Sequence, residues 1–69
     1  MNIYLVEDTV PFNLYDTYDS FVIACETEEE AKNHANTMEG MSAEGCTVKL
    51  IGTAMEGVSG LLLASFNAG

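Results

Sequence analysis

Short apolar runs separated by polar or glycine-containing segments recur along the chain, and they predict four β-strands. The runs are residues 3–6, 20–26, 46–51 and 61–66. In the second run, Phe21, Ile23 and Cys25 share one face of the pleat, with Val22 and Ala24 on the other. The segment 55–60 contains glycines and a serine, and it predicts a hairpin loop between the third and fourth strands.

A helix is predicted over residues 28–39. Thr27 can cap its first amides while Glu30, three residues later, completes a capping box. The inward stripe consists of Ala31, Ala35 and Met38, with His34 beside it. Gly40 is a suitable C-terminal stop, because glycine tolerates the conformation that ends many helices.

The order strand, strand, helix, strand, strand predicts one α+β domain over residues 1–69. We expect a four-stranded antiparallel sheet made of two hairpins, with one helix packed on one face (ββαββ). A single helix covers one face only, although several strands carry apolar residues on both faces. Residues 9–18 are predicted to form a long loop between the first two strands. The second face would be covered by the aromatic part of that loop, residues 11–18, by a second copy of the protein, or by a partner.

The composition narrows the range of possible functions. The chain has 69 residues with 11 Asp and Glu against 2 Lys and Arg, for a formal net charge of −9. Direct binding of nucleic acid or of an anionic membrane is disfavoured, because both require cationic side chains. A basic protein partner is the natural counterpart. An apolar fraction of 48% is too high for an intrinsically disordered chain.

The negative charge is concentrated in the first half of the sequence. Residues 1–30 contain no Lys or Arg and eight acids: Glu7, Asp8, Asp16, Asp19, Glu26, Glu28, Glu29 and Glu30. Residues 31–69 carry three acids and two lysines, so their net charge is only −1. Because the second strand ends where the helix begins, we expect Glu26 and Glu28 to Glu30 at one end of that strand, with Asp16 and Asp19 at its opposite end. The protein is small, so the eight carboxylates would still share one small surface, beside Tyr15 and Tyr18 as contact aromatics. This surface either keeps the protein in solution or imitates the phosphates of DNA.

The chain has no recognisable catalytic, cofactor or metal motif. Cys25 and Cys46 are not in a CxxC arrangement, and they are expected to be free, buried thiols. His34 has no nucleophile partner in a known pattern, so a structural role is expected. The N-terminus lacks a basic segment, and the longest apolar run, residues 61–64, is too short to cross a membrane. We therefore expect a cytoplasmic protein that is not an enzyme and needs no cofactor or metal.

Three segments carry a resemblance: residues 18–24 (YDSFVIA), 27–31 (TEEEA) and 64–69 (ASFNAG). They resemble small phage- and prophage-encoded proteins, a group that includes anti-CRISPR inhibitors, some of them directed at type I-C systems. The size, the acidity and the ββαββ order are also similar. The resemblance implies a phage protein that blocks a bacterial surveillance complex by imitating DNA, and it carries over no catalytic residue.

These observations predict a monomeric, stoichiometric inhibitor in the bacterial host cytoplasm. Its eight acids would pair with the Lys and Arg of a basic nucleic-acid-binding protein or of a CRISPR surveillance complex subunit. The competing prediction is a small homo-oligomeric phage structural or accessory protein. In that case the uncovered sheet face would mediate assembly, and the acidic face would simply be solvated.

Overall fold

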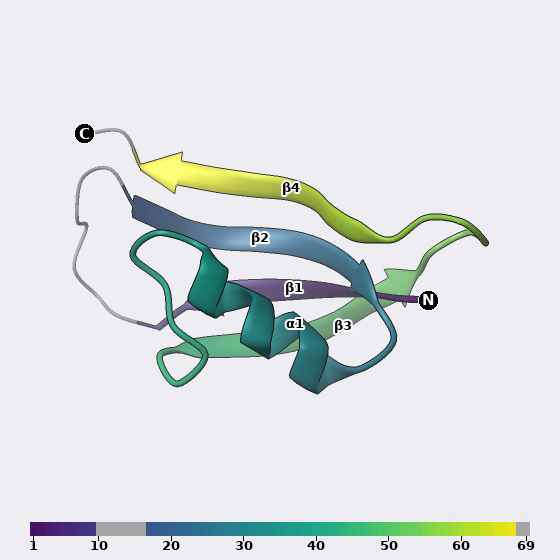
Figure 1. The fold of residues 1–69 in the computed structure, drawn as a ribbon, viewed down its shortest axis with the longest axis horizontal. Coiled ribbons are helices and arrows are strands. Elements are labelled where there is room, and N and C mark those ends of the chain that lie inside the picture. Colours follow the sequence, from purple (N-terminus) through teal and green to yellow (C-terminus); the bar gives the residue numbers. More distant parts are fainter. Residues whose placement is uncertain (10–16, 68–69) are drawn as a thin grey trace.

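The computed structural model describes residues 1–9 and 17–67, and it contains one sheet and one α-helix (Figure 1). The elements are β1 (Asn2–Asp8), β2 (Thr17–Cys25), α1 (Glu28–His34), the 3-10 turn η1 (Ala35–Thr37), β3 (Cys46–Thr53) and β4 (Gly60–Asn67). All neighbouring strands are antiparallel, and α1 lies across one face of the sheet. The predicted α+β fold with a four-stranded antiparallel sheet is confirmed.

The strand order is β3-β1-β2-β4, so β3 and β4 form opposite edges of the sheet. The predicted hairpin between them is therefore wrong. Residues 54–59 instead carry the chain across the end of the sheet, where the Ala54 amide donates to the carbonyl of Met1 at 2.7 Å. Gly57 and Gly60 have φ values of 90° and 86°, a region that glycine adopts without strain. These glycines permit the crossing but do not specify which strand β4 joins.

The second strand begins earlier than predicted. β2 includes Thr17 and Tyr18, which had been assigned to the preceding loop. The register with β4 shifts between Tyr18 and Ser20, so Asp19 is the extra residue of a bulge. Tyr18 is partly buried and packs against the core that α1 covers. Its amide donates to the Glu39 carbonyl at 2.8 Å, which ties the start of β2 to the segment after η1.

The helix starts as predicted and ends sooner. The Glu30 amide donates to the Thr27 hydroxyl oxygen at 3.1 Å, and that hydroxyl donates to the Glu30 carboxylate at 3.3 Å. The cap at Thr27 is thus confirmed. The α-helix stops at His34, because the chain tightens into η1 and the Thr37 hydroxyl donates to the His34 carbonyl at 2.7 Å. Gly40, with a φ of 87°, turns the chain away.

The core lies between α1 and the sheet. Its buried members are Tyr4, Val6, Phe21, Ile23, Cys25, Ala31, Ala35, Met38, Met41 and Cys46. Ala31 and Ala35 are fully buried, and their small side chains let the helix lie close to the strands. The His34 ring meets Phe21 edge to face, with the ring centroids 5.3 Å apart. The inward stripe predicted for the helix is therefore confirmed.

The opposite face of the sheet has no helix over it (Figure 1). Ile3, Leu5 and Val22 are half-buried there, and Leu63 of β4 stands directly opposite Val22. The aromatic segment 11–18 had been predicted to cover this face, and most of it lies outside the described residues. In the described part of the chain, this face is left open to solvent or to a partner.

Candidate functional site

The candidate site is the set of acidic side chains. In residues 1–9 and 17–67, no charged side chain is buried. Asp8 is half-buried, and nine acids are exposed: Glu7, Asp19, Glu26, Glu28, Glu29, Glu30, Glu39, Glu44 and Glu56. Two predicted site residues, Tyr15 and Asp16, lie outside the described residues.

One group of acids gathers where β1 ends and β2 begins. Glu7 and Asp8 close β1, and Glu7 stands opposite Ser20 on β2. Asp19 precedes Ser20 directly, so it belongs to the same end of the sheet. Antiparallel pairing thus brings together acids that are separated in the sequence by about ten residues.

The segment 38–45 adds two acids that the sequence analysis did not assign to the site. Backbone hydrogen bonds tie this segment to the same end of the sheet: Tyr18 to Glu39 at 2.8 Å, and Thr9 to Gly45 at 2.9 Å. Glu39 and Glu44 therefore lie on the same end of the molecule as Asp19. We call the set Glu7, Asp8, Asp19, Glu39 and Glu44 the loop-end cluster. Strand pairing creates it, and no local sequence signal marks it.

The second group lies at the beginning of α1. It consists of Glu26, Glu28, Glu29 and Glu30, and we call it the helix-start cluster. The three glutamates of the first helical turn are placed favourably, because a helix N-terminus carries partial positive charge. Thr27 fixes the start of this turn through its cap. A capping sequence rich in glutamate therefore generates this cluster locally.

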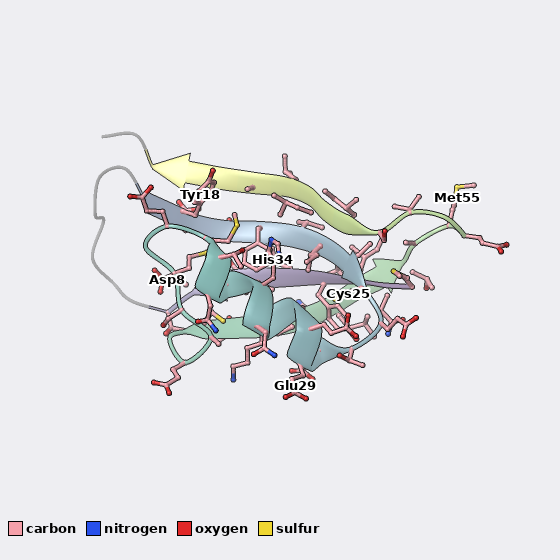
Figure 2. All side chains as sticks on the ribbon, viewed as in Figure 1. Asp8, Tyr18, Cys25, Glu29, His34 and Met55 are labelled. Carbon is pink, nitrogen blue, oxygen red and sulfur yellow. The ribbon has the colours of Figure 1, made fainter. Side chains whose placement is uncertain are left out.

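The two clusters are separated by the length of β2. Asp19 and Glu26 are seven residues apart, which corresponds to about 23 Å of extended strand. The longest dimension of the molecule is 36 Å. Figure 2 shows Asp8 and Tyr18 toward one end and Glu29 at the start of the helix. Apart from Glu56, the described acids thus form two clusters, and Asp19 and the helix-start acids lie at opposite ends of β2, as predicted.

Few cations oppose these acids. The chain has only Lys32 and Lys49, and both are exposed. Lys49 is in β3, opposite Leu5, and so points to the face without a helix. Burial raises the pKa of the Cys46 thiol, and the nearby charge of Lys32 opposes that rise. The potential at both ends of the sheet is therefore negative.

Cys25 and Cys46 are free and buried, as predicted. On β1, Cys25 faces Asn2 while Cys46 faces Asp8, so the thiols are six residues of strand, about 20 Å, apart. Burial raises the pKa of both thiols, and the charge of Glu30 raises that of Cys25 further. These cysteines act as core residues with suppressed reactivity.

The described residues contain neither a metal site nor a membrane-spanning helix. No group of three or more His, Cys, Asp or Glu side chains there has an arrangement that would hold a metal ion. Within the same residues, no helix is long and apolar enough to cross a membrane. The charged surface is the feature that remains for a functional interpretation.

No protein-family model matches the chain, and no curated protein or solved structure is significantly similar to it. The resemblance to small phage proteins therefore stays a prediction from the sequence.

Proposed function

We propose that this chain inhibits a bacterial defence complex of the CRISPR type by occupying a basic nucleic-acid-binding site. The acids stand in for DNA phosphates and pair with Lys and Arg of the target. Binding alone produces the effect, so the mechanism requires no catalytic residue and no cofactor. The place of action is the cytoplasm of the bacterial host.

The observation that carries the proposal is the exposure of the acids with so few cations beside them. Two lysines oppose eleven carboxylates in the sequence, and none of the described acids is buried. Crowded like charges destabilise a small fold through self-repulsion. A target rich in Lys and Arg relieves that repulsion on binding, which gives the protein a thermodynamic reason to prefer it.

The spacing of the clusters supports the same function. One strand of duplex DNA places a phosphate about every 3.4 Å, so about seven phosphates span the 23 Å between Asp19 and Glu26. A channel that grips several consecutive phosphates has basic residues over a comparable length. The loop-end and helix-start clusters would meet the two ends of such a channel.

Binding of the tagged protein to purified CRISPR surveillance complexes, measured with and without target DNA, tests the proposal. We expect specific capture of a basic DNA-binding subunit, competition by target DNA, and weaker association at higher salt. Capture that target DNA leaves unchanged would overturn DNA mimicry. A complete lack of binding to every complex tested would overturn the inhibitor function.

A matched pair of variants separates a specific surface from net charge. Glu29→Gln removes one charge from the helix-start cluster and leaves the Thr27 cap in place. Glu56→Gln is the control, because Glu56 is exposed and belongs to neither cluster. Each variant changes the net charge from −9 to −8. We expect about a tenfold loss of affinity for Glu29→Gln only.

The alternative function, a homo-oligomeric phage structural or accessory protein, is favoured by a separate observation. Large apolar side chains are exposed on β4, including Leu63 at 69% and Leu61 at 46%. An assembly would bury them. In that case the protein would form large, defined oligomers and would capture no basic DNA-binding protein.

A further inference from the structure

β4 is unusual among the strands because it carries no charge. β1 contains Glu7 and Asp8, β2 contains Asp19, and β3 contains Lys49. Residues 57–69, by contrast, contain no Asp, Glu, Lys or Arg at all. In a chain with a net charge of −9, this is the longest neutral segment that reaches an edge of the sheet.

The sequence of β4 is that of a central strand, although it lies at an edge. A continuous apolar run is typical of strands that are covered on both faces. Leu61 stands opposite Ile23 on the helix-covered face, and Leu63 stands opposite Val22 on the other. Both are nevertheless exposed, at 46% and 69%. α1 packs mainly on β1, β2 and β3 (Figure 1), and Ala64 of β4 packs against the core, whereas the leucines of β4 stay exposed.

The outer edge of β4 also offers unpaired backbone. Within residues 1–9 and 17–67, β4 has a strand neighbour on one side only, which is β2. Natural edge strands are usually protected by charged residues, by proline or by bulges. β4 has neither charge nor proline, and its only such device is the bulge at Leu62. β3 has a bulge of its own and also carries Lys49, which protects the other edge.

We propose that two copies of the chain pair antiparallel through β4, forming one continuous eight-stranded sheet around a two-fold axis. Backbone hydrogen bonds would provide the pairing, and the leucines of both copies would shield one another. This arrangement differs from the monomer expected from the sequence. It gives β4 the central position for which its apolar run is suited.

The charge distribution favours a second copy as the occupant. Pairing between two copies of the other edge strand, β3, would bring the two Lys49 residues together, whereas pairing between two copies of β4 brings no charged residues together. In the paired sheet, the two β2 strands are three strand spacings apart, about 14 Å. That exceeds the Debye length of about 8 Å at physiological salt, so repulsion between Asp19 or Glu26 and the partner's β2 is largely screened.

Sedimentation equilibrium of the full chain tests the pairing over about 10 µM to 1 mM, the concentration range in which a weak dimer dissociates. We expect the mass to rise from 7.4 kDa to twice that value as the concentration increases. We also expect tighter dimers at higher salt, because salt screens the remaining repulsion. The inhibitor function predicts the opposite salt dependence, so the two proposals fail independently.

Leu63→Lys places a charge on the proposed interface, and we expect it to raise the dimer dissociation constant by about tenfold or more. Leu50→Lys is the matched control, since Leu50 is 59% exposed on the opposite edge strand, β3. It makes the same charge change and should leave the dimer intact. Circular dichroism establishes that both variants are folded.

Three outcomes would overturn the proposal. The first is a monomer at every concentration and salt. The second is a dimer that Leu50→Lys dissociates and Leu63→Lys does not, which would place the interface on β3. The third is an open series of larger species, which pairing between unlike edges would produce.

Discussion

The two faces of this sheet are built from the same strands but have different physical roles. On the face under α1, Tyr4, Val6, Phe21 and Ile23 are at most 6% exposed. On the other face, Ile3, Leu5 and Val22 are only half-buried, although the small Ala24 is buried there. Alternation along a strand supplies apolar residues to both faces, so the helix accounts for most of the difference in burial. Folding stability is therefore concentrated on one face, which leaves the other face and the β4 edge free for contacts with other molecules.

Phe21→Ala, on the face covered by α1, is expected to have the largest effect on stability. Phe21 is fully buried among the core residues and touches His34, so we expect a loss of about 3–5 kcal/mol in the free energy of unfolding. For a chain of 69 residues that loss is comparable to the whole stability. Urea unfolding followed by circular dichroism measures it, and Phe21→Leu provides a milder variant that stays folded.

Val22→Ala is the matched control on the other face, one residue along the same strand. Val22 is half-exposed, so its truncation should lower the free energy of unfolding by about 1 kcal/mol or less. Equal losses for the Phe21 and Val22 variants would show that the open face is as important to folding as the covered one.

A smaller loss of stability is expected from weakening the N-terminal cap of α1, the helix that covers the core. Thr27→Ala removes the hydroxyl that accepts from the Glu30 amide, which should cost about 1 kcal/mol of stability. Thr27→Ser keeps a capping hydroxyl and should restore most of that loss. Hydrogen exchange is the sharper measurement, because amides of α1 should lose protection before those of β1 and β2. Uniform loss of protection would mean that helix and sheet open only together.

The smallest effect concerns the two thiols, both on the covered face. Burial raises the pKa of Cys25 and Cys46, so the folded state favours the neutral thiols. As the pH rises above about 8.5, the unfolded chain loses these protons first. Stability from this source is thus complete below that pH and is lost as the pH rises through the folded pKa values.

Urea midpoints at neutral and alkaline pH, compared between wild type and the Cys25→Ala, Cys46→Ala double variant, measure this linkage. The double variant should lose less stability than wild type on going to alkaline pH. An identical pH dependence would show that these thiols titrate alike in the folded and unfolded chains. Alkylation of the two thiols provides an independent measure of how well they are shielded from solvent. It should be slow in the folded protein and rapid in urea.

Much of the fold was predictable because the relevant signals are local. Alternating apolar residues identified four strands, and Thr27 with Glu30 identified the start of the helix. The end of the helix was predicted too late, because the switch to a 3-10 turn at Ala35 depends on the packing of the following segment. Tyr18 was assigned to a loop, since the bulge at Asp19 disrupts the alternation that marks a strand.

The site was predictable only in part. The helix-start cluster follows directly from consecutive glutamates after a capping residue. The loop-end cluster needs the pairing of β1 with β2 and the docking of segment 38–45, which bring Glu39 and Glu44 to the acids of the first two strands. The distance between the loop-end cluster and the helix-start cluster likewise depends on the length and direction of β2.

Local patterns and composition specify which segments are strands, where the helix begins, which residues face the core, and how negative the protein is. These properties depend on neighbours within a few residues and on the count of charged side chains. Tertiary packing specifies that β4 joins β2, that Glu39 and Glu44 join the acids at one end of the sheet, and that Cys25 and Cys46 lie far apart. Backbone hydrogen-bonding groups are the same in every strand, so alternation specifies the faces of a strand but leaves its partner to the packing of the whole chain.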